Sequence, residues 1–224
     1  EYIRCIRLEI QNCMDYGFDP HERTTHLSLI DCLAHENGLD GFTIDYSIDT
    51  EVRGCHSWNN GRHGFNIVTD SYNITLSDCV AENNGNHGLM IQNRAYNVTV
   101  LNCSFNNNLQ NGVHIREIDS VKLEGCDIQG NQREGIILRG SWYIDVLGNY
   151  LLDNGLTGGY SDIRLNDYTN PDTSITRGTR NCMIFNNTIF SLSAPHSRYG
   201  VYEALGLQDF NHVPYNSFSG QLNG

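Results

Sequence analysis

The chain has 224 residues, of which 39% are hydrophobic, so it is long enough and apolar enough to bury one substantial core. Its formal net charge of −12, with Lys122 as its single lysine, argues against a nucleic-acid partner, which would need clustered cations against its phosphates. No apolar run is long enough to span a membrane. Arginines that converge in one cleft would still bind an acidic polymer, because arginine recognises carboxylates through paired hydrogen bonds.

A repeat of 23 or 24 residues organises the chain. Its marker is a glycine followed by an apolar residue, at Gly17, Gly41, Gly64, Gly88, Gly112 and Gly135. Positions one and three places after each glycine are the predicted inward positions of a short strand, because side chains alternate between its faces. These positions hold Phe18, Phe42, Phe65, Leu89, Val113 and Ile136, and then Pro20, Ile44, Ile67, Ile91, Ile115 and Leu138. Four places before the glycines, a predicted ladder of side-chain amides at a sharp turn comprises Asn37, Asn60, Asn84, Asn108, Asn131 and Asn154.

A second strand is predicted in each repeat around an apolar column. The column comprises Leu29, Val52, Leu76, Val100, Leu123 and Val146. Three places later stand Cys32, Cys55, Cys79, Cys103, Cys126 and Asn149. Stacked strands lie about 4.8 Å apart, so the spacing leaves disulfides between repeats open. We interpret the cysteines as buried free thiols that pack as small apolar side chains.

These columns predict an all-β fold, a right-handed parallel β-helix with about 23–24 residues per coil. Each coil can bury its apolar face only against its neighbours. We expect residues 1–224 to form a single β-helix domain, a fragment that lacks its N-terminal coils and cap. The register breaks at 167–181, DYTNPDTSITRGTRN, which predicts an insertion of loop character. It resumes in CMIFNNTIF at 182–190 and in YGVYEALGL at 199–207.

Positions two and four after each glycine are predicted to face outward on a flat sheet surface. The first outward column comprises Asp19, Thr43, Asn66, Met90, His114 and Ile137. The second comprises His21, Asp45, Val68, Gln92, Arg116 and Arg139. The residues just before the glycines form a third column, Tyr16, Asp40, His63, His87, Asn111 and Glu134, with Arg62 beside His63. Whether the third column faces the same surface stays open.

The stretch YGFDPHE at 16–22 carries unusual chemistry for one strand of the repeat, including a proline that strands rarely accept. Asp19 and His21 share a face, and Asp45 stacks one coil away from His21. A histidine flanked by carboxylates has a fixed tautomer and acts as a base near neutral pH, and Tyr16 offers a second proton-transfer group. A single histidine–aspartate pair is usually only solvated, but this concentration predicts a catalytic site. For His87, His114 and Arg139, a polymer groove and a merely hydrated sheet stay equally open.

Three segments resemble the catalytic module of mannuronan C5-epimerases, which are secreted alginate-modifying enzymes with a right-handed parallel β-helix. They are YGFDPHE at 16–22, NGLDGFTIDY at 37–46 and GRHGFNIVT at 61–69. The resemblance implies that Tyr16 and His21 transfer protons on opposite sides of the sugar ring. It also implies that Asp19 and Asp45 complete the catalytic cluster and that Arg62, His63 and Arg116 bind substrate carboxylates. The further candidate substrate-binding residues are Asp40, Asn66, His87, His114, Arg139 and Tyr199.

The resemblance also implies the surroundings of the reaction. The expected partner is an anionic polysaccharide, alginate or polymannuronate, and the expected site of action is extracellular, in a cell wall or matrix. Ca²⁺ is the expected companion ion, although the sequence does not identify its ligands, and no organic cofactor is expected. We expect a monomer that binds neither nucleic acid nor a membrane.

Three alternatives stay open from the residues. An alginate lyase would share the first proton abstraction and then expel the C4 oxygen. A polygalacturonase-type hydrolase would need a pair of carboxylates, which Asp19 and Asp45 could imitate. A non-catalytic polysaccharide-binding β-helix would present the same polar columns without turnover.

Overall fold

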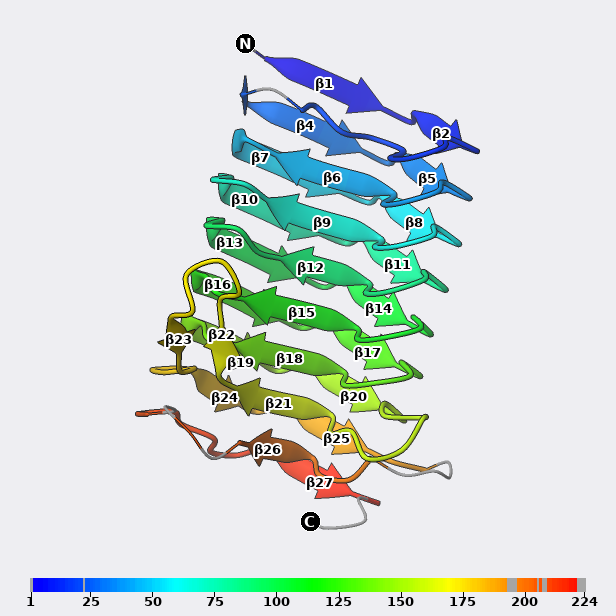
Figure 1. Cartoon of the computed structure of the whole chain (residues 1–224). Coiled ribbons are helices and arrows are strands. Elements are labelled where there is room, and N and C mark those ends of the chain that lie inside the picture. Colours follow the sequence, from blue (N-terminus) through cyan, green and yellow to red (C-terminus); the bar gives the residue numbers. More distant parts are fainter. Residues whose placement is uncertain (1, 22, 193–196, 205, 207–208, 221–224) are drawn as a thin grey trace.

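The chain forms a stack of coils with three parallel β-sheets along its sides, as a computed structural model shows (Figure 1). The structure describes residues 2–21, 23–192, 197–204, 206 and 209–220. Each typical coil contributes one strand to each sheet, and the strand paired next to it comes from the following coil. The predicted all-β solenoid is therefore confirmed, with the N-terminal end at the top of Figure 1 and the C-terminal end at the bottom.

Two of the sheets have nine strands each and form the sides away from the glycine-marked strands. The first comprises β1 (Ile3–Ile6), β4 (Leu27–Ile30), β7 (Ser47–Arg53), β10 (Tyr72–Ser77), β13 (Tyr96–Leu101), β16 (Asp119–Glu124), β19 (Trp142–Leu147) and β24 (Met183–Phe185), with β3 (Thr24–Thr25) also paired to β7. The second comprises β2 (Glu9–Gln11), β5 (Leu33–His35), β8 (His56–Trp58), β11 (Val80–Glu82), β14 (Ser104–Asn106), β17 (Asp127–Gln129), β20 (Tyr150–Leu152), β25 (Thr188–Phe190) and β27 (Ser217–Ser219).

The third sheet has seven strands and is the one that carries the outward columns, so it is called the site sheet below. It comprises β6 (Phe42–Asp45), β9 (Phe65–Val68), β12 (Leu89–Ile91), β15 (Val113–Arg116), β18 (Ile136–Arg139), β21 (Ile163–Asn166) and β26 (Val201–Glu203). Its register aligns residues at equal distance from the marker glycine, for example Phe42 with Phe65 and Ile44 with Ile67.

The core runs along the inside of the stack. Phe42 and Phe65 are fully buried, and their rings stack at 5.3 Å between centroids. From β6 onward the predicted inward positions of the site sheet are buried, as is the Leu29 column of the second predicted strand. Burial of each such side chain stabilises the fold by roughly 1.5–3 kcal/mol relative to exposure. The predicted core columns are therefore confirmed from β6 onward, whereas Phe18 and Pro20 of the first repeat are only partly buried.

The sharp turn before each marker glycine is held by the predicted amide ladder. The Asn60 side-chain amide donates to Oδ1 of Asn84 at 3.0 Å, and the Asn84 amide donates to Asn108 at 3.1 Å. Each of these carbonyls also accepts a backbone N–H of the preceding coil. The marker must be glycine because a Cβ at Gly41 would lie 2.0 Å from Oγ of Ser57. The close packing of neighbouring coils thus explains the periodic Asn and Gly.

The cysteine column lies inside the stack as free thiols, as the sequence interpretation favoured. All eight cysteines are free, and Cys32, Cys55, Cys79, Cys103, Cys126 and Cys182 are buried. The Cys79 thiol donates to the carbonyls of Ser77 at 3.2 Å and Val52 at 3.5 Å. The column therefore packs as small side chains that donate to carbonyl oxygens.

The insertion at 167–181 is more ordered than the predicted loop. It contains an antiparallel hairpin of β22 (Tyr168–Thr169) and β23 (Thr176–Arg177), which Figure 1 places beside β18 and β19. Oδ1 of Asn170 accepts the backbone N–H of Asp172 at 2.9 Å, which forms the turn. The Asn170 amide also donates to Glu117 at 2.9 Å. This bond fixes the hairpin against the coils, a contact that composition does not reveal.

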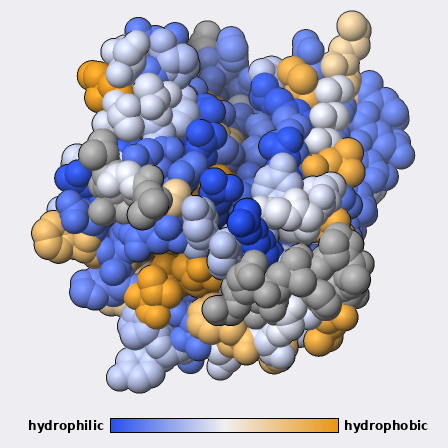
Figure 2. Space-filling view, turned by 60° about the horizontal axis from the view of Figure 1, so that its bottom comes forward, coloured by the Kyte–Doolittle hydropathy of each residue, from blue (hydrophilic) through white to orange (hydrophobic). Residues whose placement is uncertain are grey.

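In the described residues, no helix is long and apolar enough to cross a lipid bilayer. The space-filling view toward the C-terminal end shows mostly hydrophilic residues, with apolar residues in scattered patches (Figure 2).

Candidate active site

The segment that begins the candidate site departs from the strand geometry of the other coils. Only Phe18 keeps a bridge to the next coil, to Phe42. Pro20 has no N–H to donate, and His21 has φ of 52° in the left-handed region, which ends the strand. The expectation of an ordinary strand with alternating faces is therefore wrong here. Because the chain turns, the His21 backbone N–H donates to Oδ1 of Asp19 at 3.0 Å, and Nδ1 lies 3.5 Å from Oδ2.

Asp19, His21 and Asp45 form one cluster, which is called the catalytic cluster below. One ligand-type atom from each lies within 4.8 Å of the others. The His21 side chain is 84% exposed, whereas Asp19 is only 14% exposed. Oδ1 of Asp45 is buried and has no hydrogen-bond partner among the described residues. A buried oxygen without a partner is costly in a merely structural setting and is typical of functional sites.

The catalytic cluster does not fit calcium. Ca²⁺ takes six to eight oxygen ligands, whereas this cluster combines an imidazole nitrogen with two carboxylates. Among the described residues it is the one group of three or more potential ligands close enough to hold an ion. The donor set instead suits a histidine that is oriented by its two carboxylate neighbours.

Asp40 is the centre of a second group, one that holds Arg62 in place. The carboxylate is fully buried, and it accepts from Arg62 Nε at 2.7 Å and Arg62 Nη2 at 2.6 Å. It also accepts from the His63 backbone at 3.0 Å, Asn66 Nδ2 at 2.9 Å and Thr43 Oγ1 at 3.1 Å. Burial opposes ionisation of Asp40, but the Arg62 bonds outweigh it and hold its pKa below the usual value.

The Arg62 guanidinium reaches from this pair toward Tyr16, and its Cζ lies 5.5 Å from the centre of the Tyr16 ring. The bonds to Asp40 raise the pKa of Arg62 further, so the group stays a cation. Arg62 thus places a fixed positive charge beside a phenol that lies two coils before it, a cation–π arrangement. The sequence indicated both Arg62 and Asp40 as substrate-binding residues, but it did not indicate that Asp40 pairs with Arg62 and orients it.

His63, His87 and His114 form a buried row instead of a hydrated surface, so the hydrated-sheet alternative is wrong for His87 and His114. The rings of His63 and His87 stack at 4.9 Å, and His114 meets His87 edge-on at 4.8 Å. Burial lowers the pKa of His63 to about 4, although the Asp40 charge opposes it. Burial, with the charges of Arg116 and Arg139, lowers the pKa of His114 to about 3, and burial also lowers the pKa of His87.

The neutral histidine row predicts a loss of stability in mild acid. The folded-state pKa of His63 lies below its unfolded value, so its contribution is complete above about pH 6.5 and is lost as the pH falls toward 4. We expect His63 alone to lower the free energy of unfolding by about 3 kcal/mol over this window. Urea unfolding of the wild type and His63→Asn at several pH values measures this slope. The account is contradicted if His63→Asn has the same slope as the wild type, and exposed His26→Asn is the control.

Arg116 and Arg139 occupy neighbouring strands of the site sheet and are paired in register. The Arg116 guanidinium donates to Oε1 of Gln92. The Cζ atoms of Arg116 and Arg139 lie 5.2 Å and 5.3 Å from the Tyr168 ring. Nε of Arg139 is buried without a hydrogen-bond partner among the described residues, and burial lowers its pKa. Two close cations that share an aromatic ring are suited to bind an anion.

Sequence reasoning missed Tyr168, because it lies in the insertion that was predicted to be a loop. The one sequence feature that pointed to Tyr168 is that it is an aromatic residue close to the end of a predicted coil. The candidate Tyr199 lies far from the catalytic cluster, at the C-terminal end, where its ring stacks on Tyr202 at 5.0 Å. The structure thus groups the predicted residues into the catalytic cluster, the Asp40–Arg62 pair with Tyr16, the histidine row and the two arginines, and it separates Tyr199 from them.

The chain is similar to known proteins over nearly its whole length. The family described as "Right handed beta helix region" matches residues 4–117 and 92–219. Mannuronan C5-epimerase AlgE5 of Azotobacter vinelandii is 37% identical over 228 residues, which cover 97% of this chain and 22% of the relative. Alginate lyase 7 of the same organism is 36% identical over 243 residues, which cover 97% of this chain and 26% of the relative.

Solved structures give the same result. The A-module of mannuronan C-5 epimerase AlgE4 from Azotobacter vinelandii matches with a TM-score of 0.95 at 29% identity, over 98% of this chain and 60% of that chain. The A-module of AlgE6 matches with a TM-score of 0.87 at 31% identity, over 99% of this chain and 64% of that one. This chain therefore corresponds to a part of each relative. It belongs to the right-handed β-helix family, and within that family it is related to the mannuronan C5-epimerases and to an alginate lyase.

Proposed function

We propose that this chain converts β-D-mannuronate to α-L-guluronate within alginate, by inverting C5 of the sugar. The observation that carries the proposal is the catalytic cluster of Asp19, His21 and Asp45, with Tyr16 just before Asp19 and Arg62 on the coil after that of Asp45. A base, an acid and a fixed cation are the groups that such an inversion requires. The relatives named as mannuronan C5-epimerases support the same reaction.

In the first step His21 takes the proton from C5. The C5–H bond breaks, and its electron pair moves into the attached carboxylate, which becomes an enolate with added negative charge. Arg62 stabilises this charge, because Asp40 has already oriented its guanidinium and little reorganisation is needed. Asp19 and Asp45 hold the imidazole and stabilise the imidazolium that forms.

In the second step a proton is delivered to the opposite face of C5. Tyr16 donates its phenol proton, a new C5–H bond forms from the enolate pair, and the phenolate regains a proton from solvent or His21. Two groups are needed, because one residue does not easily reach both faces of the ring. The order of His21 as base and Tyr16 as acid is part of the proposal.

The remaining candidates position the polymer or the catalytic groups. Arg116 and Arg139 bind the carboxylates of neighbouring uronates, with the Tyr168 ring against both guanidinium groups. Asn66, His63, His87 and His114 are buried. Asn66 and the His63 backbone hold Asp40, and His87 and His114 continue the packed row that begins at His63. Tyr199 contacts the polymer further along the site sheet.

Incubation with polymannuronate tests the proposal. Guluronate signals that grow in the proton NMR spectrum support it, and an unchanged polymer excludes it. The second candidate is elimination by an alginate lyase, which the match to alginate lyase 7 favours. A lyase would expel the C4 oxygen from the same enolate, and unsaturated ends would then absorb in the ultraviolet.

Three further parts of the proposal concern the surroundings. Action outside the cell is proposed because the substrate is a matrix polysaccharide, and a monomer is proposed as the working form. A requirement for Ca²⁺ rests on the family resemblance, and no step of the mechanism runs through the ion.

A further inference from the structure

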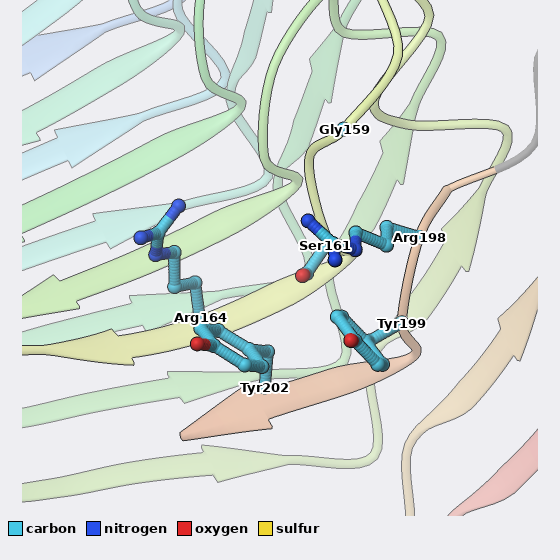
Figure 3. Close-up of a pocket in the computed structure, with 6 residues that line it drawn as sticks. All are labelled: Gly159, Ser161, Arg164, Arg198, Tyr199 and Tyr202. Carbon is cyan, nitrogen blue, oxygen red and sulfur yellow. The ribbon is translucent and has the colours of Figure 1, made fainter. Parts of the chain in front are cut away.

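An arginine-lined hollow lies at the C-terminal end of the site sheet (Figure 3). Its volume is about 110 Å³, and its lining is Gly159, Ser161, Arg164, Arg198, Tyr199 and Tyr202. Arg164 comes from β21 and Tyr202 from β26, whereas Arg198 and Tyr199 come from the segment that enters β26. We call this hollow the distal pocket.

The distal pocket is built on a stacked pair of rings. Tyr199 and Tyr202 stack at 5.0 Å with their planes 18° apart. The Arg164 Cζ lies 5.4 Å from the Tyr202 ring, and the Arg198 Cζ lies 5.4 Å from the Tyr199 ring. The two guanidinium groups therefore flank one stacked aromatic pair, which holds two cations beside the same hollow.

The cations of the distal pocket are only partly neutralised. Arg164 bonds through Nη1 to the buried carboxylate of Glu134 at 3.2 Å, but its Nε is buried with no hydrogen-bond partner in the described part of the chain. Arg198 is exposed, and no described carboxylate forms an ion pair with it. The lining is therefore cationic, and the exposed guanidinium of Arg198 offers N–H donors, which match a carboxylate.

The distal pocket continues the columns that build the candidate active site. Phe18 pairs with Phe42, so Asp19, the next residue, is level with Thr43. Asp19 therefore begins the first outward column of the site sheet, which includes His114. The order of that column is Asp19, Thr43, Asn66, Met90, His114, Ile137, Arg164 and Tyr202. The backbone N–H of Ile163 donates to the carbonyl of Gly200, as the N–H of Phe18 donates to that of Gly41. Gly200 therefore occupies the position of a marker glycine, and Tyr199, just before it, lies in the column of Tyr16 and Asp40. One straight polymer can therefore touch both sites.

We propose that the distal pocket binds the carboxylate of a uronate unit that lies several sugars away from the unit in the catalytic cluster. The proposal rests on the proposed function, because it takes the same polymer as the ligand. Asp19 and Arg164 are six strand steps apart, which places the pocket roughly 29 Å along the sheet at about 4.8 Å per step. The pocket thus holds long chains in register and makes no contact with oligomers too short to reach it.

Arg198→Glu tests this anchor, because Arg198 is exposed and its replacement leaves the Arg164–Glu134 pair in place. We expect the affinity for polymannuronate, measured by calorimetry, to fall about tenfold and the KM for the polymer to rise by a similar factor. Affinity and turnover for oligomannuronates too short to cover six coils are expected to stay unchanged. Arg164→Lys, which keeps the charge toward Glu134 but loses the planar fork, should show a smaller effect of the same kind.

Arg94→Ala is the matched control, because Arg94 is 73% exposed and pairs with Asp70 away from this pocket. An unchanged polymer affinity in Arg198→Glu, or an equal loss for short oligomers, would overturn the distal pocket as an anchor. If the wild type binds polymannuronate but makes no guluronate, the proposed function fails. The calorimetric comparison of the wild type with Arg198→Glu still tests whether the distal pocket binds the polymer.

Discussion

Replacing His21 with asparagine is expected to lower the rate of guluronate formation by about 10³-fold, within the range that a positioned acid or base contributes. The amide cannot accept the C5 proton, so the first step loses its base. Asparagine is preferred to alanine because His21 has φ of 52°, a conformation that asparagine tolerates. The fold is expected to persist, because the side chain is 84% exposed. Rates are measured by proton NMR with polymannuronate in excess.

His26 offers a close control for this variant. It also has a left-handed backbone, with φ of 55°, and its Nδ1 lies 3.7 Å from the Asp49 carboxylate. It lies between β3 and β4, outside the site sheet. His26→Asn is expected to retain the wild-type rate. If His21→Asn is as active as His26→Asn, His21 is not the base, and a non-catalytic polysaccharide-binding role regains weight.

Replacing Arg62 with leucine is expected to lower the free energy of unfolding by about 3 kcal/mol and to abolish turnover. The reason for the instability is Asp40, which is fully buried and would keep a charge without its partner. The reason for the lost activity is separate, because the enolate would lack its prepared cation. Urea unfolding measures the first effect, and NMR turnover measures the second.

The double variant Asp40→Asn, Arg62→Leu separates the two effects. It removes the buried charge together with its partner, so most of the lost stability is expected to return. Turnover is expected to stay absent, because the cation is still missing. Recovery of activity together with stability would show that Arg62 acts only as a structural partner of Asp40.

The fold could be predicted from the sequence because its determinants are local and periodic. Each coil needs a glycine where the next coil approaches, an asparagine to satisfy the turn, and apolar residues at alternate positions. The pattern of Phe42, Asn60 and Gly64 therefore predicts the same local structure as the equivalent residues predict in the other typical coils. The catalytic cluster could be predicted in part for the same reason, since the bridge from Phe18 to Phe42 holds this coil against the next one, in which Asp45 lies.

The parts that could not be predicted depend on departures from the repeat. The turn at Pro20 and His21 replaces a strand, and only the proline signalled it. Tyr168 reaches Arg116 because the hairpin folds back, and that contact depends on bonds such as Asn170 to Glu117. In the coil of Arg164, Asp162 occupies the position of the marker glycine, because Ile163 after it pairs with Ile136. Asp162 lies eight residues after the ladder residue Asn154, to which it is bonded, whereas these positions are four residues apart in the other typical coils. Arg164 therefore fell outside every column that the period defined.

Epimerisation of polymannuronate in D₂O tests the central claim most directly. If His21 removes the C5 proton and a second group returns one from the other face, each new guluronate unit carries deuterium at C5. Proton NMR and mass spectrometry of the degraded product then show the label in guluronate. Guluronate that keeps the original hydrogen at C5, or unsaturated ends without guluronate, would contradict the account.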